Sequence, residues 1–298
     1  MYEDWRTILA ALYLPGSPHS QHLDRRRWPA ILGALRSLGL EAPTAEIGLR
    51  SKGLISESIA LGAGNSLDWA KRLEPSQFLT CLDEAYPDRW LAVLKDQAPP
   101  VGWFAGTTAK AMPCLGIVGS REVESFVHRF CGEVARCAVD LGFRVVSGGA
   151  VGCDQTALQA AVRYGGSALT IRPYGIGLAE NVAEGAALFS VCEPDEVFSR
   201  SRAMERNALI YAAGRFTVVG QVRFREGGTW HGATAAIRRG TTQVLVRKPG
   251  SNEADEVVRG AKALVALGAL YLEEPGQLED HCRAPTLDHG LFAGLKAG

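Results

Sequence analysis

The stretch LGIVGSREVESF, residues 115–126, carries the strongest indication of the fold. Its first half is a continuous apolar run ending in Gly-Ser, which is typical of a parallel strand buried on both faces of a sheet. Its second half opens the segment 123–142, in which apolar residues recur with the period of a helix. The apolar face predicted for this helix consists of Phe126, Phe130, Val134, Cys137 and Leu141. A buried strand followed directly by an amphipathic helix predicts the first half of a βαβ unit.

The same alternation continues along the chain. The runs FRVVSGG (143–149) and SALTIRPYG (167–175) predict two further strands, separated by a helix over 153–166. Additional strands are predicted at 77–83, 101–106, 215–220, 242–250 and 269–272, and additional helices at 86–94, 234–240 and 255–268. Strands that alternate with helices at this pitch predict the α/β class, here a Rossmann-like, doubly wound and mostly parallel sheet.

Three parts of the chain are distinguished by their composition. In residues 1–75, Trp5, Ile8, Leu9 and Leu12 lie at helical spacing, which predicts a small helical N-terminal module. Residues 76–275 contain the strand–helix alternation and are expected to form the Rossmann-like domain. Residues 276–298 are polar and small, so a C-terminal tail is expected there.

Glycine-rich segments follow three of the predicted strands, at residues 116–121, 147–154 and 226–233. In an open parallel sheet such loops lie at the carboxyl ends of the strands, where ligands bind at the switch in strand order. Backbone amides and helix N-termini there form a ready anion site, and Ser120, Ser147 and Thr229 add hydroxyl donors. The three loops together favour phosphate binding over a purely structural use of glycine.

The charge of the chain is balanced overall and uneven locally. Lys plus Arg and Asp plus Glu both number 32, which excludes a protein that is basic over its whole surface. Residues 197–250 contain ten Lys or Arg against Glu205 and Glu226, a local excess of +8. Arginine suits bidentate contact with phosphate, so this segment favours a polyanionic ligand.

Several other classes of protein are disfavoured by what the sequence lacks. It contains neither a G-x-G-x-x-G run after the first strand of the Rossmann-like segment nor a P-loop, which disfavours dehydrogenases and P-loop hydrolases. The seven cysteines form no C-x-x-C pair, so neither a metal site nor a disulfide framework is expected. The N-terminal residues do not resemble a signal peptide, and no apolar run approaches the length of a membrane span. We therefore expect a cytoplasmic protein without a cofactor and without a membrane partner.

A hydrolase remains as a weaker alternative. Ser120, His231 and Asp154 are the residue types of a catalytic triad, but no G-x-S-x-G elbow surrounds Ser120. Asp154 begins the helix predicted over 153–166, and an acidic residue in that position is more typical of a helix cap.

The ordered series of motifs resembles the DNA-processing protein A (DprA/Smf) family. It comprises LGIVGSREVESF, VVSGGAVGCDQTALQAAV (145–162), ERN (205–207) and GGTWHGATAAIRRG (227–240). The resemblance covers roughly residues 76–250, and a helical N-terminal module is also typical of the family. It implies a non-enzymatic Rossmann-like domain that binds single-stranded DNA, forms a homodimer and helps to load a RecA-type recombinase during natural transformation.

The resemblance also implies which residues bind phosphate. Gly119, Ser120 and Arg121 would line the pocket, and Ser147, Gly148 and Gly149 would form its second wall. Arg206 with Asn207 would complete the pocket, and Gly227, Gly228 and Thr229 would belong to a further loop of it. The aromatic side chains considered for stacking on bases are Phe224, Trp230 and Tyr174.

The sequence departs from the family pattern at two positions of the second loop and its helix. Val151 stands where the family usually has an arginine, and Leu158 where it usually has a histidine. The third loop, GGTW, is closer to the lysine-decarboxylase-like branch of the same superfamily, although the phosphoribohydrolase motif of that branch is missing. A nucleotide sensor or nucleotide hydrolase, and a protein–protein adaptor with purely structural glycines, therefore stay open as alternatives.

Overall fold

The computed structural model describes residues 2–18, 24–38, 42–55, 66–107, 111–177 and 182–283. Within these ranges a nine-stranded sheet has the strand order β1-β2-β6-β5-β4-β3-β7-β8-β9. The seven strands from β6 to β9 run parallel, whereas β2 pairs antiparallel with both β1 and β6. The strands are β1 (Phe78–Thr80), β2 (Val101–Gly106), β3 (Cys114–Val118), β4 (Arg144–Ser147), β5 (Ala168–Arg172), β6 (Ala186–Ser190), β7 (Gly214–Val219), β8 (Gln243–Arg247) and β9 (Leu270–Leu272).

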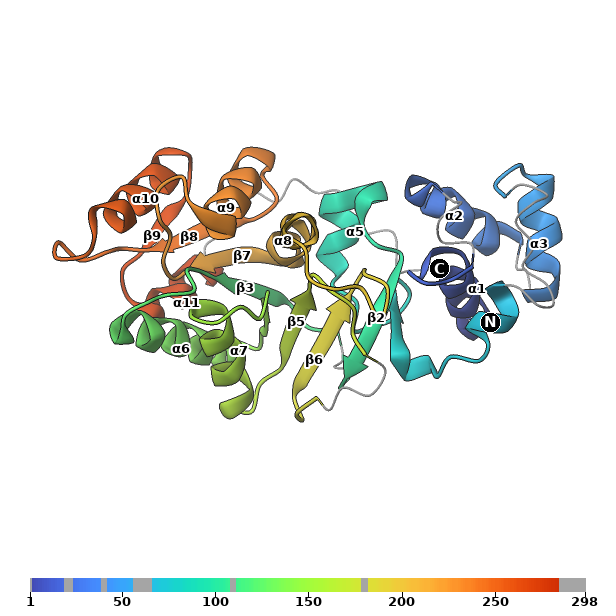
Figure 1. The fold of residues 1–298 in the computed structure, drawn as a ribbon, viewed down its shortest axis with the longest axis horizontal. Coiled ribbons are helices and arrows are strands. Elements are labelled where there is room, and N and C mark those ends of the chain that lie inside the picture. The colour runs from blue at the N-terminus through green and yellow to red at the C-terminus, as the bar shows by residue number, and fades with distance from the viewer. Residues whose placement is uncertain are drawn as a thin grey trace.

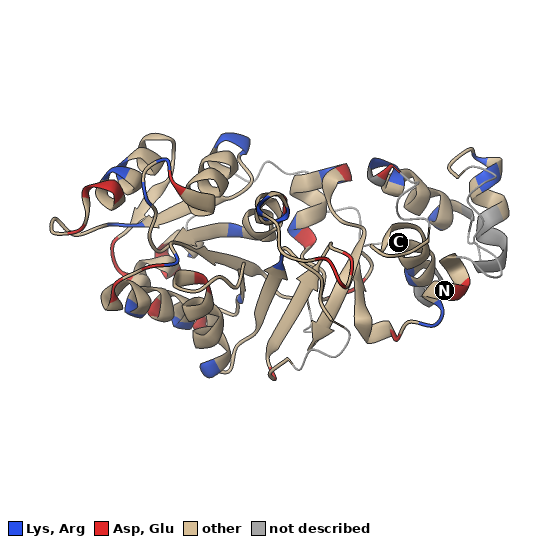
Figure 2. Cartoon of the chain, viewed as in Figure 1, with Lys and Arg blue, Asp and Glu red and all other residues tan. Residues whose placement is uncertain are grey.

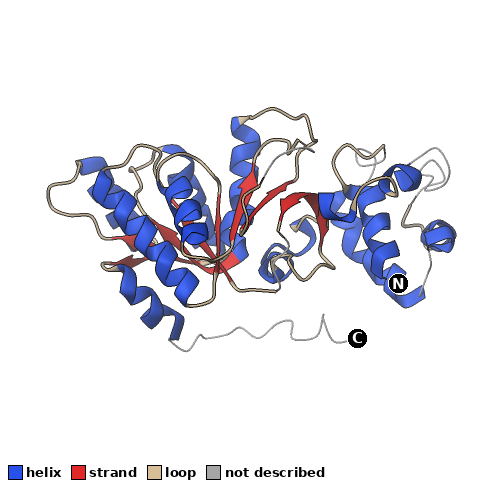
Figure 3. Cartoon of the chain, turned by 90° about the horizontal axis from the view of Figure 1, so that it is seen from below, coloured by secondary structure: helices blue, strands red, loops and turns tan. Residues whose placement is uncertain are grey.

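Helices cover both faces of this sheet (Figures 1 and 3). One face carries α6, α7 and α11, and the opposite face carries α5, α8, α9 and α10. The helices are α1 (Tyr2–Tyr13), α2 (Trp28–Leu38), α3 (Ala42–Ser51), α4 (Ser66–Ala70), α5 (Asp88–Leu94), α6 (Ser125–Asp140), α7 (Cys153–Arg163), α8 (Arg200–Ala213), α9 (Gly227–Arg239), α10 (Asp255–Ala266) and α11 (Leu278–Arg283). This arrangement confirms the prediction of a doubly wound, Rossmann-like α/β fold.

The central strands are apolar along their whole length because both of their faces are covered. In β3, Leu115 and Ile117 pack into the cluster beneath α6 and α7, whereas Cys114 and Val118 pack into the cluster on the opposite face. All four side chains are buried. Successive side chains of a strand point to opposite faces, so a continuous apolar run is what a strand between two helical layers requires.

Two of the sequence predictions need correction. The face that α6 buries is made of Val127, Cys131, Val134, Ala135 and Ala138, and Phe126 is exposed. Phe130, Cys137 and Leu141 of the predicted face are partly buried and pack against the cluster beneath α6 and α7. The prediction is therefore wrong for Phe126 and omits the small residues of the buried face. The second correction concerns the segment 226–233, which is not a loop: α9 begins at Gly227 and contains most of it.

The helical N-terminal module packs against the antiparallel end of the sheet (Figure 3). Trp5 and Ile8 of α1 are buried, as expected. Arg6 forms an ion pair with Asp83 at 2.8 Å and donates a hydrogen bond to the Pro75 carbonyl. The indole of Trp103 in β2 donates to the Pro15 carbonyl at 3.0 Å. The contacts of Arg6 with Asp83 and of Trp103 with Pro15 cross the boundary expected after residue 75 and join the module to the sheet.

The packed part of the chain extends past the boundary expected at residue 275. A short 3-10 turn, Pro275–Gln277, leads into α11, which contacts α6. Leu278 is fully buried in the cluster beneath α6 and α7. The chain is therefore packed as far as Arg283, and the remainder of the expected tail, 284–298, lies outside the described residues.

Across the described ranges, every helix is too short or too polar to span a membrane. Histidine, cysteine and carboxylate side chains of the same ranges form no group of three or more that could hold a metal ion. All seven cysteines are free thiols.

The fold predicts a large stability contribution from Trp90 of α5. Its side chain is fully buried, its indole N–H donates to the Leu209 carbonyl of α8 at 2.7 Å, and its ring meets Tyr86 edge-on at 5.0 Å. Trp90→Ala is expected to lower the free energy of unfolding by about 3–5 kcal/mol, because it leaves a cavity and removes the hydrogen bond between α5 and α8. Urea denaturation measures this loss.

Leu270→Ala provides the control, because Leu270 lies on the edge strand β9 and is 46% exposed. A loss for Trp90→Ala no larger than that for Leu270→Ala would contradict the packing between α5 and α8.

Candidate functional site

A cavity of about 730 Å³ opens at the carboxyl edge of the central strands. Strand β3 lies between β4 and β7, and the chain crosses from one side of β3 to the other through α8 (Figure 1). This is the topological switch point, at which the loops leaving neighbouring strands diverge and leave a crevice. The loops after β3 and β7 and the first turns of α8 and α9 line the cavity.

The carboxylate of Asp154, in the first turn of α7, joins two of the loops. One oxygen accepts the backbone N–H of Gly119, after β3, and the other accepts the N–H of Gly148, after β4, each at 3.2 Å. Asp154 is only 8% exposed. Burial raises its pKa from the ordinary value of 3.8 to about 6, and the guanidinium of Arg206 and the two N–H donors counteract this rise.

The guanidinium of Arg206, on α8, reaches under the same loops. It donates to the Gly148 carbonyl at 2.8 Å and to the Ile171 carbonyl at the end of β5. The side chain is 8% exposed, and burial lowers its pKa. Its Nε has no hydrogen-bond partner in the described structure. Arg206 therefore connects α8 to the ends of β4 and β5, and it also lines the cavity.

The beginning of α9 forms the opposite wall. The hydroxyl of Thr229 donates to the Gly119 carbonyl at 2.9 Å, and Asn207 of α8 donates to the Gly228 carbonyl at 3.4 Å. The first N–H groups of a helix have no partner within the helix, and the side chain of Glu226 does not cap them. The N-terminus of α9 thus presents free amides and a partial positive charge to the cavity.

Arginines outnumber acidic residues around the cavity. Arg121, Arg200, Arg206 and Arg223 line it, together with Glu122, Asp154 and Glu226. Arg223 lies 3.7 Å from Glu226, whereas Arg121 and Arg200 have no carboxylate partner among the described residues. Figure 2 shows the Lys and Arg positions of α8, which is viewed nearly end-on. The exposed, unpaired guanidiniums are the ones available to an anionic ligand.

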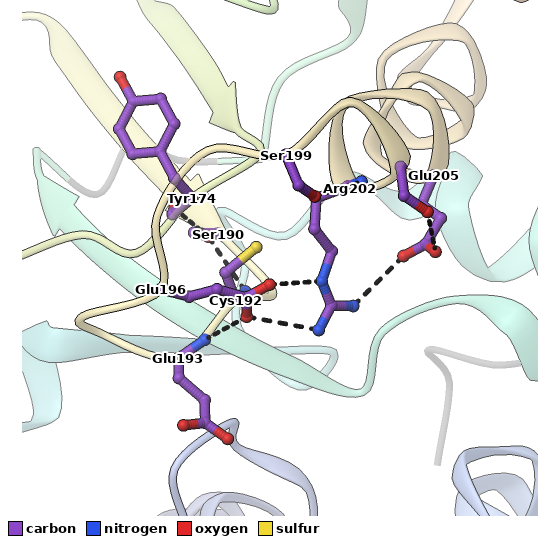
Figure 4. Close-up of polar contacts among 9 residues, drawn as sticks. Tyr174, Ser190, Cys192, Glu193, Glu196, Ser199, Arg202 and Glu205 are labelled. Carbon is purple, nitrogen blue, oxygen red and sulfur yellow. Dashed lines mark hydrogen bonds and ion pairs between the residues drawn. The ribbon is translucent and has the colours of Figure 1, made fainter.

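A network of polar contacts holds the segment between β6 and α8 (Figure 4). Arg202 binds both oxygens of Glu196, at 2.6 and 3.3 Å, and also contacts Glu205 at 3.2 Å. Glu196 in turn accepts the backbone N–H of Glu193 at 3.2 Å. This network fixes the approach to α8 and thereby places Phe198, which is 51% exposed, at the edge of the cavity.

The structure gathers eight of the sequence-predicted site residues around the cavity: Gly119, Ser120, Arg121, Arg206, Asn207, Gly227, Gly228 and Thr229. The remaining three do not line it. Ser147 is fully buried and donates its hydroxyl to the Ile117 carbonyl, and Gly148 bonds to Asp154 and Arg206. Gly149 is exposed and has a φ of +74°, which suits glycine. Ser147 and Gly148 therefore hold the loops in place beside the cavity rather than line it.

Other cavity residues were not singled out from the sequence, among them Phe198, Arg200, Met204 and Tyr211. All four belong to α8 or the segment leading into it, and neither β6 nor α8 was predicted as an element. The aromatic residues that were singled out lie elsewhere: Phe224 and Trp230 pack edge-on against each other at 5.2 Å. Tyr174 is partly buried beside Arg172.

The hydrolase alternative gains no support from the geometry. Ser120, Asp154 and His231 all line the cavity, yet no hydrogen bond joins any two of them in the described structure. The Ser120 hydroxyl donates to the Gln221 carbonyl instead. The expectation that Asp154 caps α7 is wrong: the N-cap position is Gly152, and Asp154 bonds to the two neighbouring loops.

The two departures from the family pattern have different surroundings. Leu158 is buried in the cluster between α7 and the sheet, where an apolar side chain packs well. Val151 is 60% exposed in the turn before α7. At that turn the loop therefore contributes no cation.

The fold and the cavity define a Rossmann-like α/β protein with an arginine-lined cavity at the switch point of its sheet. The chain belongs to the DNA recombination-mediator protein A family, whose sequence model matches residues 77–282. This match confirms the resemblance to DprA and Smf proteins.

Individual relatives agree with this assignment. A Mycobacterium tuberculosis protein named as a DNA processing protein DprA is 28% identical over 49% of this chain and 45% of its own length. Protein Smf of Synechocystis is 25% identical over 77% of this chain and 61% of its own length. The chain thus spans about half the length of the first of these relatives.

Solved structures show the same fold. DNA processing protein A from Streptococcus pneumoniae superposes with a TM-score of 0.66 at 18% identity, covering 94% of this chain and 98% of that protein. DNA processing protein A from Helicobacter pylori, described for its binding of single-stranded DNA, gives a TM-score of 0.57 at 22% identity and covers 70% of this chain and 96% of its own.

The raised pKa of Asp154 predicts a pH dependence of stability. Because the folded protein holds the proton up to pH 6 while the unfolded chain releases it near 3.8, the stability contributed by this group falls as the pH rises through that range. The free energy of unfolding of the wild type minus that of Asp154→Asn is expected to decrease by about 2 kcal/mol between pH 4 and pH 7.

Urea denaturation at a series of pH values measures the difference. Asp195→Asn, at an exposed carboxylate, serves as the control and should give a curve nearly parallel to the wild type. Parallel curves for the Asp154→Asn variant as well would show that this carboxyl is not held in a buried, desolvated position.

Proposed function

We propose that this protein is a non-enzymatic, cytoplasmic single-stranded DNA-binding protein that acts in DNA processing. The observation that carries the proposal is the arginine-lined cavity at the switch point of the sheet. Arg121 and Arg200 are exposed and unpaired there, next to the free N-terminal amides of α9. A phosphodiester fits this combination, because amides and guanidiniums both donate hydrogen bonds to phosphate oxygens.

Apolar side chains at the edge of the cavity support a single strand over a duplex. Phe198 is 51% exposed and Met204 is 58% exposed, and both line the cavity. Exposed aromatic and flexible apolar side chains provide platforms on which unpaired bases stack, and stacking does not depend on base identity. Bases within a duplex are not available for such contacts.

Two further steps complete the proposal. The family resemblance implies that the protein forms a homodimer and delivers single-stranded DNA to a RecA-type recombinase during natural transformation. The binding of DNA to the cavity is the step from which both would follow, so it is the step to test first.

A mononucleotide is the second candidate ligand. The cavity volume of about 730 Å³ lies within the range of small-molecule sites. A nucleotide at one hundred times its dissociation constant would raise the free energy of unfolding by about 2.7 kcal/mol. Thermal denaturation with a panel of nucleotides separates this candidate from a site that requires a polynucleotide.

Charge reversal at Arg121 is predicted to remove most of the binding to single-stranded DNA. The affinity of Arg121→Glu for a labelled oligo-dT strand should fall at least about tenfold, because a hydrogen-bonded charge pair is replaced by repulsion. The slope of log K against log salt should also become less steep by about 0.7 for each phosphate that the variant no longer neutralises. Fluorescence anisotropy at several salt concentrations measures both quantities.

Arg163→Glu is the matched control, because Arg163 is exposed in the last turn of α7 and does not line the cavity. It carries the same change of charge away from the loops and should bind nearly as the wild type does. Binding by the wild type that is independent of salt, or equal preference for the duplex, would overturn the proposal.

A further inference from the structure

A second cavity, of about 520 Å³, adjoins the first. It lies between α8, α9 and the segment formed by α5 and the following 3-10 turn, Lys95–Gln97. The two cavities share four lining residues, namely Met204, Asn207, Tyr211 and His231. A ligand held in the first cavity therefore has a continuous path into the second.

The path follows the direction of α9. His231, Ala235 and Arg239 line the second cavity at intervals of four residues, so they lie on one face of the helix. At 1.5 Å per residue, the eight positions from His231 to Arg239 span about 12 Å. The second cavity is a narrow groove, because Gly232 of α9 lets this helix approach α8 closely. A Cβ on Gly232 would lie 2.6 Å from the ring of Tyr211.

The two long walls of this groove differ in charge. The α9 wall carries Arg239, which is exposed and has no acidic partner among the described residues. The opposite wall carries Val93, Leu94 and the carboxylate of Asp96. A phosphate is attracted to the α9 wall and repelled from the Asp96 side, whereas the apolar surface of α5 suits the face of a base.

We propose that the groove between α8 and α9 is a second subsite, which binds the nucleotide next to the one held in the first cavity. In this arrangement Arg239 contacts the phosphate, and Val93, Leu94 and Met204 surround the base. The inference rests on the proposed function, since it extends the path of the same single strand.

The test compares two adjacent arginines in the same turn of α9. Arg239 lines the groove, whereas Arg238 is exposed and does not. Arg239→Glu is expected to weaken the binding of an oligo-dT strand about tenfold and to make the salt slope less steep by about 0.7, the value for one phosphate. Arg238→Glu carries the same change of charge and should have less than a twofold effect.

A second variant tests the groove without changing its charge. Ala235→Trp fills the space between α8 and α9 and should weaken binding while leaving the salt slope unchanged. Urea denaturation confirms that each variant is folded.

The outcomes separate the inference from the proposed function. Equal effects of Arg239→Glu and Arg238→Glu, with strong binding by the wild type, would overturn the second subsite and leave the first intact. Loss of binding in Arg121→Glu together with unchanged binding in Ala235→Trp would also overturn the second subsite and leave the first intact. Failure of the wild type to bind any single strand would overturn the proposed function itself.

Discussion

The arrangement of the site depends on one buried carboxylate. Asp154 accepts the N–H groups of Gly119 and Gly148, so a single side chain sets the spacing between the loops that leave β3 and β4. Arg206 holds the carbonyl of the same Gly148 from the opposite direction. Burial raises the pKa of Asp154 and lowers that of Arg206, which means that both charges are costly to desolvate. We infer that both buried groups are retained for the loop geometry that their hydrogen bonds to the backbone impose rather than for net stability.

The loops after β3 and β4 require glycine mainly because neighbouring atoms lie too close to leave room for a Cβ. A Cβ on Gly148 would lie 2.6 Å from a nitrogen of Arg206, and a Cβ on Gly119 would lie 2.4 Å from the sulfur of Cys153. Gly152 has a φ of +86°, and a Cβ there would lie 2.4 Å from the Ser120 carbonyl oxygen. The glycines thus allow the loops to pack on one another, while the N-terminus of α9 supplies the free amides. Close packing is a property of the two loops after β3 and β4, whereas the free amides belong to a helix, although all three glycine-rich segments look alike in sequence.

Strands could be predicted from the sequence where burial alone determines which positions are apolar. The run at residues 115–118 is apolar because β3 is covered on both faces, and that run is enough to predict a parallel strand. The same reasoning missed α8, because only its last two turns are largely apolar and its first turns carry arginines. The start of α9 was placed too late, since Gly227 and Gly228 favour a loop by their intrinsic propensity, whereas the structure includes both in the helix. Ser147 was predicted as a hydroxyl donor of the site, both from its glycine-rich segment and from the family resemblance. It is fully buried at the end of β4, in an orientation that local sequence does not specify.

Most of the +8 charge excess of residues 197–250 is not available to a ligand, because many of these cations are paired within the protein. Arg202 is paired with Glu196 and Glu205, Arg247 with Glu253, and Lys248 with Glu273. Arg247 also donates to the Gly220 carbonyl at 2.8 Å, so this cation holds the loop after β7 in place. The guanidinium of Arg206 likewise donates to backbone carbonyls beneath the loops. The remaining exposed arginines lie near the cavity and on α9, where Arg238 and Arg239 are adjacent. In the proposed complex, these few cations would both fix the register of a single strand and contribute to its affinity, and stacking on exposed side chains would add to the binding energy.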